Sequence, residues 1–319
     1  MVMKKQLLSA MAVVLLGCIV TVRGATIFED ENSKIDLYGR LSVDFNFETG
    51  YTGFRNNGSR LGLRGYHNLN QKLSAYGNFE ARFDGSLRTG QFAPRETYFG
   101  VKGDFGDVRF GEFESVFDDH VSGISDIGLS NVWNYYSLGD THDAGRNLAY
   151  YNRIGGVSFG IMMTHQERDT AAGTDQAFNV QAGASIPLHD KVTLGIAVNQ
   201  DDDNFGGGNP IFGAGLRLSL IEGLSWGIVA ETQNNNATTL GTVARYDLAG
   251  QGLPGTNVYG YVGAANRAGG NPNEMQLSFG SSYRITRGFR VFGEVNHRNV
   301  SGGGGGGTTR FAVGSRYDF

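Results

Sequence analysis

Two His–Asp pairs are the side chains of this 319-residue chain best suited to acid–base chemistry. His142 precedes Asp143 and His189 precedes Asp190, and an imidazole beside a carboxylate can transfer protons. Both pairs fall in predicted connections between strands. The other histidines show no spacing shared by a zinc site, and Gly302–Gly307 is followed by neither the Gly-Lys-Ser/Thr nor the helix of a phosphate loop. We therefore predict that the protein is not an enzyme and uses no metal and no cofactor.

Other charged side chains lie on the polar faces of strand-like segments, in which polar and apolar residues alternate. Asp36, Arg40 and Asp44 share one face of a segment whose other face is apolar. By the same alternation, Arg64 and Arg82 lie on the polar faces of their own segments. A period of two indicates β-strands, and an apolar face opposite a polar one suits a barrel wall in lipid. Opposite charges about 8 to 10 Å apart across such a lumen interact by roughly 2 kcal/mol at an effective dielectric near 20, which orients water and dipolar solutes.

Alternating segments of this kind cover the chain after about residue 35. A soluble sandwich would also alternate, but its strands average about five or six residues, whereas several segments here run to ten or more. An even number of strands is usual for single-chain bacterial barrels. We predict sixteen strands, near 35–47, 59–66, 72–83, 93–102, 107–113, 145–152, 157–166, 176–186, 191–200, 210–220, 224–233, 239–248, 256–265, 274–285, 289–299 and 308–319.

Composition agrees with a membrane barrel of one domain. No apolar stretch after Val22 is long enough for a membrane-spanning helix, and without one a membrane protein must satisfy its backbone hydrogen bonds as a closed barrel. Glycine accounts for 50 residues, and the five prolines fall at predicted turns, loops or strand starts. The chain carries 27 basic and 31 acidic residues, a net charge of −4, which is unfavourable for general nucleic-acid binding.

The first residues have the three parts of a secretory signal peptide. Lys4 and Lys5 precede an apolar run from Leu7 to Val22, and the small residue Gly24 follows. We predict that residues 1–24 are removed and that 25–319 form the barrel. The run Leu15–Cys18 also resembles a lipoprotein box, which leaves an acylated Cys18 as an alternative. Cleavage after Gly24 would leave the mature chain without cysteine and therefore without disulfides.

The last ten residues place Phe311, Val313, Tyr317 and Phe319 on one face and polar or small residues on the other. This segment resembles the C-terminal strand of bacterial outer-membrane barrels, which ends in Phe and is read by the barrel assembly machinery. We expect it to close the barrel against the segment near Ile35, with Tyr317 and Phe319 in the periplasmic aromatic girdle.

Connections between the predicted strands alternate in length. The short ones include Gly103–Gly106, Ile154–Gly156 and Pro187–Asp190 and should face the periplasm, whereas longer polar ones such as Glu48–Gly58 and Glu167–Asp175 should face outward. About thirty residues separate Phe113 from Gly145, too many for a hairpin.

Taken together, the chain resembles the general diffusion porins of the Gram-negative outer membrane, whose third loop folds into the lumen. Asp36–Arg40 (D-L-Y-G-R), Ser59–Gly65 (S-R-L-G-L-R-G) and Arg146–Tyr151 (R-N-L-A-Y-Y) carry the likeness, together with the long loop and the terminal Phe319. The resemblance extends over nearly all of the mature chain. It implies an all-β transmembrane antiparallel barrel and a homotrimer.

The resemblance also implies roles for individual residues. Porins of this family set basic wall residues against acids of the infolded loop. The resemblance therefore implies basic wall positions at Arg40, Arg60 and Arg146, to which the alternation alone adds Arg64 and Arg82, and the facing acids are expected to be Asp118, Asp119 and Asp126. Many relatives carry a wall arginine on the fifth strand just before the loop. Here that stretch reads R-F-G-E-F, so Glu112 is expected in its place, which with the net acidity favours mild cation selectivity.

We therefore expect an outer-membrane channel for passive diffusion of small hydrophilic solutes, surrounded by lipid and lipopolysaccharide. A substrate-specific sugar or nutrient channel is an alternative, supported by Trp133, Tyr135 and Tyr136 in the long loop. A closed structural or adhesive barrel is another. Asp201–Asp203 is expected to be solvated loop charge, with divalent-ion bridging to lipopolysaccharide phosphates as the other interpretation.

Overall fold

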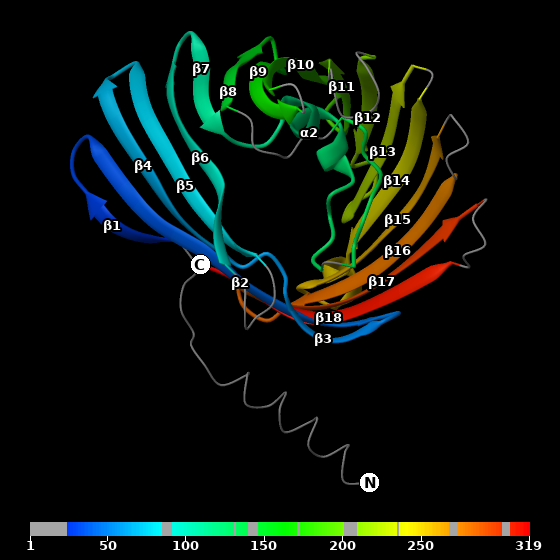
Figure 1. Cartoon of the computed structure of the whole chain (residues 1–319). Helices are drawn as coiled ribbons and strands as arrows, with labels where there is room; N and C mark the ends of the chain where they lie inside the picture. Colours follow the sequence, from blue (N-terminus) through cyan, green and yellow to red (C-terminus); the bar gives the residue numbers. More distant parts are fainter. Residues whose placement is uncertain are drawn as a thin grey trace.

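Sixteen antiparallel strands close into a barrel around a segment that enters its interior (Figure 1). The computed structural model describes residues 24–84, 91–130, 132–139, 146–170, 173–200, 209–234, 236–267, 273–301 and 307–319. The predicted signal peptide lies outside these residues except for Gly24. The barrel strands are β2 (Ser33–Glu48), β4 (Arg60–Asn70), β5 (Leu73–Asp84), β6 (Gln91–Gly103), β7 (Gly106–Glu112), β8 (Arg146–Ile154), β9 (Val157–Thr170), β10 (Gly173–His189), β11 (Val192–Gln200), β12 (Ile211–Leu218), β13 (Leu224–Gln233), β14 (Ala237–Asp247), β15 (Thr256–Arg267), β16 (Glu274–Arg284), β17 (Phe289–Val300) and β18 (Thr308–Asp318).

Each strand pairs with its neighbours in sequence, and β18 pairs with β2 to close the ring, from Phe311 opposite Phe47 to Asp318 opposite Arg40. The terminal Phe319 extends the closure, since its backbone exchanges hydrogen bonds with Gly39. The sixteen predicted strands and the closing role of the last segment are confirmed. Among the described residues, no helix is long and apolar enough to cross a membrane.

Two short strands that the alternation did not predict lie beside β2. With 16 residues, β2 is longer than either neighbour. Along one edge of β2, Ser33–Arg40 pairs with β4 and Val43–Glu48 pairs with β3 (Tyr51–Asn56). Along the other edge, Arg40–Phe47 pairs with β18 and Lys34–Leu37 pairs with β1 (Ala25–Glu29). The extra strands satisfy backbone groups that would otherwise form open edges. The prediction of a plain loop over Glu48–Gly58 was therefore wrong.

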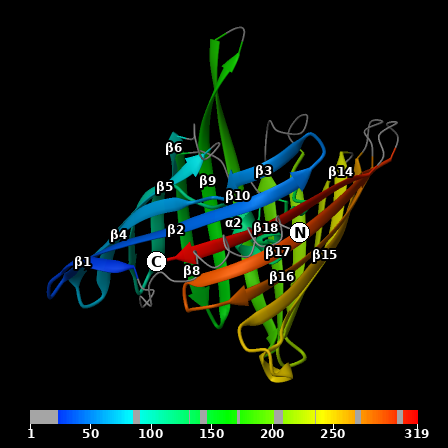
Figure 2. The same cartoon turned by 90° about the horizontal axis from the view of Figure 1, so that it is seen from below.

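The hairpin of β9 and β10 also differs from the prediction. Its strands run to Thr170 and from Gly173, through most of the stretch predicted as the loop Glu167–Asp175. It rises above the other strands at the end of the barrel opposite the short turns (Figure 2). Short turns connect β6 to β7, β8 to β9 and β10 to β11, as predicted, and by the usual arrangement of such barrels this end faces the periplasm.

The two faces of the wall differ as the alternation requires. On β2 and β18, Leu41, Phe311 and Val313 point outward and are 59%, 49% and 62% exposed. Ser42, Asp44 and Asn46 point inward and are buried. An exposed belt of large apolar side chains is unfavourable in water and favourable in lipid.

Candidate pore constriction

The loop between β7 and β8 enters the barrel and begins with a short helix. Ser115 caps α2 (Val116–His120), since its side chain accepts a hydrogen bond from the backbone N–H of Asp118 at 3.0 Å. Asp118 and Asp119 occupy the first turn, where carboxylates interact favourably with the helix dipole. A 3-10 turn, η2 (Ser122–Ile124), follows. A second 3-10 turn, η3 (Ala249–Gln251), belongs to a distant connection.

Glycine residues on the inner wall allow this helix to pack closely against the barrel. We call them the glycine seat; they come from five neighbouring strands and are Gly160, Gly183, Gly195, Gly213, Gly215 and Gly227. A Cβ atom at Gly213 would lie 2.4 Å from the Phe117 ring, and one at Gly195 would lie 1.9 Å from the carbonyl oxygen of His120. Side chains at these positions would collide with the loop, so the glycine seat lets α2 and η2 pack on bare backbone.

Buried wall carboxylates hold the rest of the loop. Glu294 on β17 accepts hydrogen bonds from the backbone N–H groups of Leu129 and Ser130 at 2.6 and 2.8 Å, and from the Tyr259 hydroxyl at 2.6 Å. Glu231 on β13 accepts from the backbone N–H groups of Leu138 and Gly139 and from the Ser137 hydroxyl. Hydrogen bonds to charged acceptors are stronger than neutral ones, so each carboxylate fixes a turn of the loop.

Neutral side chains complete the attachment. Gln181 and the Tyr261 hydroxyl accept from the loop backbone, and Asn199 and Gln276 donate to it. These groups come from β10, β15, β11 and β16. We call the wall from β9 to β17 the loop-bearing wall, and the wall formed by β2 and β4–β7 the open wall. The described part of the loop lies mainly along the first wall and reaches the second at Glu114, which contacts Arg95 (Figure 1).

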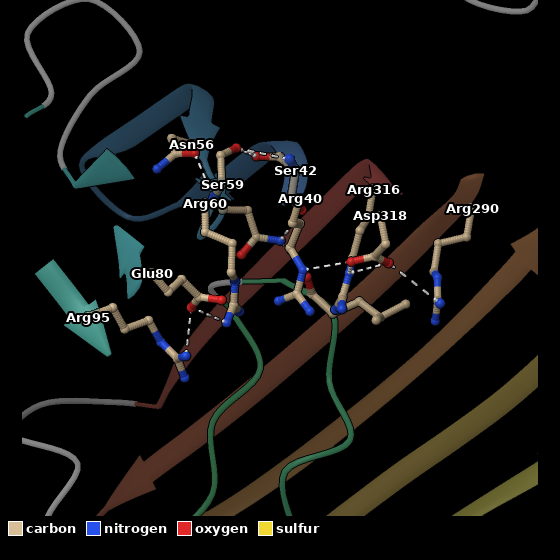
Figure 3. A network of polar contacts seen from close by, with 12 residues as sticks. Arg40, Ser42, Asn56, Ser59, Arg60, Glu80, Arg95, Arg290, Arg316 and Asp318 are labelled. Atoms are coloured by element: carbon tan, nitrogen blue, oxygen red, sulfur yellow. Dashed lines mark hydrogen bonds and ion pairs between the residues drawn. The ribbon is translucent and has the colours of Figure 1, made fainter. Parts of the chain in front are cut away.

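Four charged side chains of the open wall and one of the loop form a cluster, which we call the arginine–glutamate cluster; Figure 3 shows its Arg60, Glu80 and Arg95. Arg60 lies 3.0 Å from Glu80, and Arg95 lies 2.8 Å from the same carboxylate. Arg95 also contacts Glu96 and lies 2.5 Å from Glu114 of the loop. Arg60 was predicted as a basic wall residue; it faces the lumen, but Glu80 compensates its charge.

A β-bulge brings Arg95 into this cluster. Glu80 pairs with Glu96, but the next residue, Ala81, pairs with Pro94, so Arg95 is the extra residue of β6. Strict alternation from the outward Phe99 would place Arg95 outside. The bulge turns Arg95 and Glu96 inward together. Pro94 was the available sequence signal, because proline within a sheet is confined to edges, strand starts and bulges.

A second cluster surrounds Asp318 near the barrel closure (Figure 3). The nearest side-chain distances from Asp318 are 2.9 Å to Arg40, 3.0 Å to Arg316 and 3.7 Å to Arg290. Arg40 therefore faces the lumen as predicted, with a carboxylate partner that the alternation also placed inside. Three guanidinium groups around one carboxylate leave an excess of positive charge here.

The structure places the remaining predicted basic residues in two groups. Arg64 lies on the inner face of β4, 4.6 Å from the centre of the Tyr38 ring, and Arg82 lies on the inner face of β5 opposite Arg60. Arg146 does not join them. It pairs with His165 on the face that carries Leu148 and Met163, 45% and 41% exposed, whereas Ala149 and Met162 are buried on the inner face. Strand β8 therefore presents Arg146 outward, and its prediction as a lumen residue was wrong.

The prediction that Glu112 takes the place of a wall arginine at the lumen was also wrong. Glu112 pairs with Thr97, on the face of the outward Phe99 and Phe110, so it does not take a lumen position. Arg109 of the same strand does. Its guanidinium lies 4.9 Å from the ring centres of Tyr98 and Tyr151 and 5.1 Å from that of Phe113. The fifth barrel strand thus carries an inward arginine after all, and the argument for cation selectivity from Glu112 is lost.

The predicted acids of the loop differ in burial from the residues that pack on the wall. Val116, Phe117 and His120 are buried against the wall, while Asp118 is half-buried and Asp119 and Asp126 are exposed. Asp119 is reached by water although strands surround it. Enclosure by those strands and repulsion from Asp118 raise its pKa to about 7. Asp119 and Asp126 are thus loop acids open to water, and their part in a pore constriction stays a prediction.

The loop aromatics are structural. The Trp133 ring packs against Tyr259 and Tyr261, with ring centres 5.4 and 6.4 Å apart, and its N–H donates to the Ser125 carbonyl. Trp133 and Tyr136 are buried, which leaves no exposed aromatic track among them. No group of metal-ligating side chains occurs in the described part of the chain. His142 and Asp143 lie outside that part, and His189 accepts a turn hydrogen bond from Lys191.

Sequence reasoning missed the groups that attach the loop and pair the wall arginines. Glu231 and Glu294 alternate inward like any lumen acid, and nothing local distinguishes them from solvated charge. Arg109 could have been found, since Val108 and Phe110 on either side point outward.

Comparison with known proteins identifies the class. The family model of the Gram-negative porin matches residues 9–319, and the chain belongs to this family. One relative is a monosaccharide porin of a Halomonas species, which is 29% identical over 40% of this chain and 36% of the relative. Another is outer membrane protein S2 of Salmonella typhi, which is 23% identical over 99% of this chain and 78% of the relative. The first alignment thus spans about a third of that relative's length. The crystal structure of Salmonella typhi OmpF with daunomycin has the same fold, with a TM-score of 0.72 over 92% of this chain and all of that one at 18% identity.

Family membership and the apolar outer belt place the protein in the Gram-negative outer membrane.

Proposed function

We propose that the protein forms a water-filled channel through which small hydrophilic solutes and ions cross the outer membrane by passive diffusion. The observation that carries this proposal is the open wall. Its inward side chains are charged or polar, and the loop is held mainly by the other wall, through Glu231 and Glu294. Barrels of this strand number commonly enclose an aqueous channel.

Single-channel recording tests the proposal. Purified, folded protein in planar bilayers should give discrete, long-lived conductance steps that grow with salt concentration. Absence of steps above baseline would instead favour a closed structural or adhesive barrel.

The sugar-specific alternative has limited support. One relative is named a monosaccharide porin, but the loop aromatics that might have stacked on sugars are packed into the wall. Block of the ion current by one sugar at micromolar concentration, with no block by its isomers, would favour this alternative over general diffusion.

We further propose that the protein is a homotrimer embedded among lipid and lipopolysaccharide. The family supports this, as does the similarity to OmpT of Vibrio cholerae in its trimer form, with a TM-score of 0.64 at 15% identity. Chemical cross-linking in native outer membranes should yield species of up to three chains. A ladder that stops at one chain would contradict the proposal.

The C-terminal strand is proposed as the segment that the assembly machinery reads. The Phe319 ring packs over Gly39, where a Cβ would lie 2.5 Å from it, and stacks with Tyr317 at 5.8 Å. Deletion of Phe319 should reduce insertion into the outer membrane while leaving expression unchanged. Normal insertion of the shortened chain would contradict this role.

A further inference from the structure

A pocket rich in tyrosine and basic side chains lies on the open wall at the periplasmic end of the barrel. It has a volume of about 220 Å³ and is lined by side chains of four adjacent strands, β4 to β7. Its polar and aromatic lining consists of Arg64, Tyr66, Tyr76, Tyr98, Lys102 and Arg109, together with Asn78 and Asp107. It adjoins the arginine–glutamate cluster, which lies farther along the same strands, because its Asn78 donates a hydrogen bond to Glu96 at 3.4 Å.

Three cations meet one carboxylate in this pocket. Asp107 accepts a hydrogen bond from the Tyr76 hydroxyl and lies 3.6 Å from Arg109. Lys102 lies opposite Asp107 in the strand register but makes no ion pair in the described part of the chain; its ammonium is 5.7 Å from the ring centres of Tyr66 and Tyr76. Two positive charges are therefore left uncompensated by the pocket's own lining.

Arg64 likewise forms no salt bridge with any described residue. Asp36 lies opposite Arg64 in the register, but Lys34 binds this carboxylate at 3.1 Å and the Thr26 hydroxyl donates to it at 2.7 Å. The Arg64 guanidinium stacks on Tyr38 instead. A guanidinium held by its face against a ring keeps its N–H edge available for an acceptor.

The aromatic walls of the pocket are fixed in place before any solute arrives. The Tyr76 ring lies over Gly100, where a Cβ would be 2.4 Å away, and the Tyr38 ring lies over Gly62 at the same distance. Tyr76 and Tyr98 meet edge to face with ring centres 6.3 Å apart. Arg109 is held among Tyr98, Tyr151 and Phe113. A rigid pocket loses little conformational entropy on binding.

We propose that this pocket is a binding subsite for small organic anions that carry a carboxylate on a flat, ring-shaped body. Lys102, Arg64 and the edge of Arg109 bind the carboxylate, and the tyrosine rings pack against the flat body. The subsite rests on the proposed channel function and gives it a preferred solute class. A solute held here dwells at the periplasmic exit and interrupts the ion current.

Side-specific addition of benzoate to single channels in planar bilayers tests the subsite, with benzamide and acetate as comparison solutes. Benzoate added on the periplasmic side should produce concentration-dependent interruptions in the millimolar range. Benzamide lacks the charge and acetate lacks the ring, so both should block more weakly. Lys102→Gln and Arg64→Gln should each weaken the benzoate block by roughly tenfold, because each removes one charged hydrogen-bond donor.

Lys72→Gln is the matched control. Lys72 lies at the same end of the barrel with its side chain 80% exposed and 3.7 Å from Asp104, outside the pocket, so its loss should leave the block unchanged. Unaltered unitary conductance would show that each variant folds.

Open channels that benzoate does not block, or block that both pocket variants retain, would overturn the subsite and leave the proposed channel intact. Equal block by benzamide would overturn the assignment to anions. Absence of any channel would overturn both the subsite and the channel.

Discussion

The loop-bearing wall and the open wall are both built from alternating strands, but their inward side chains make different contacts. On the loop-bearing wall, many inward positions are glycines that seat α2 or buried polar groups, such as Glu231 and Glu294, that bind the loop backbone. On the open wall, arginines, tyrosines and carboxylates remain at the lumen. An inward charge therefore attaches the loop where the loop covers it. Where the loop does not cover it, the charge remains available to water or to a solute.

The open wall itself contains two contrasting regions. In the arginine–glutamate cluster, Arg60 and Arg95 face three carboxylates and are paired at short distances. In the periplasmic pocket, three cations face one carboxylate. Pairing, and not the number of arginines, decides where mobile ions experience a field.

Removal of Arg95 is expected to have the largest effect. Arg95→Gln removes an arginine that contacts Glu80, Glu96 and Glu114, so the reversal potential under a potassium chloride gradient should shift strongly toward cations. Loss of a partner for the buried Glu80 should also destabilise the barrel by about 2 kcal/mol, measured as a lower unfolding temperature in detergent.

Arg146→Gln is the control for this prediction. It removes the same charge from an outward position and should leave the reversal potential unchanged. A comparable shift in both variants would contradict the assignment of Arg95 to the lumen and Arg146 to the outer face.

Filling the glycine seat tests the loop-bearing wall. Gly213→Leu introduces a side chain into the space of Phe117 and Val121 and should displace α2, at a cost of about 1 to 3 kcal/mol for overpacking. The displaced loop should change the unitary conductance. Gly65→Leu, at a β4 position with open space around its Cβ, should leave conductance unchanged. Equal effects from the two substitutions would argue against the seat.

Weakening one carboxylate attachment should have a smaller effect. Glu294→Gln replaces charged acceptors for Leu129 and Ser130 with one neutral oxygen and a misplaced donor, which costs about 1 to 2 kcal/mol locally. We expect more frequent current fluctuations with a nearly unchanged mean conductance. Quiet, wild-type traces from Glu294→Gln would show that this carboxylate does not hold the loop.

The smallest expected effect is a pH dependence from Asp119. Because its pKa is raised to about 7, this carboxyl is charged above neutral pH and becomes protonated as the pH falls through that range, at a higher pH than an ordinary carboxylate. Cation preference should therefore decline as the pH is lowered across neutrality. Asp119→Asn should abolish the decline, whereas Asp126→Asn should retain it.

The sequence predicted the barrel well because a strand's two faces are decided by a local period of two. The outward Leu41 and Phe311 and the inward Arg40, Arg60, Arg64 and Arg82 all followed from alternation or from the family motifs. Alternation gave no correct prediction at Arg95, because a bulge interrupts the period of two there. The family motif placed Arg146 on the lumen face, whereas this residue lies on the outer face of β8. Alternation also did not anticipate β1 and β3, two short strands that pair with the edges of β2 where β4 and β18 do not reach.

Taken alone, the amino-acid sequence determined sixteen strands, the apolar outer belt, the closing role of the C-terminal segment and the presence of one oversized acidic loop. These properties depend on residues close together in the chain. The tertiary structure decided which wall the loop covers, which arginines are neutralised by glutamates, and where cations remain uncompensated. Those outcomes depend on contacts such as Arg95 with Glu114, or Glu294 with Leu129, between segments that only the closed barrel brings together.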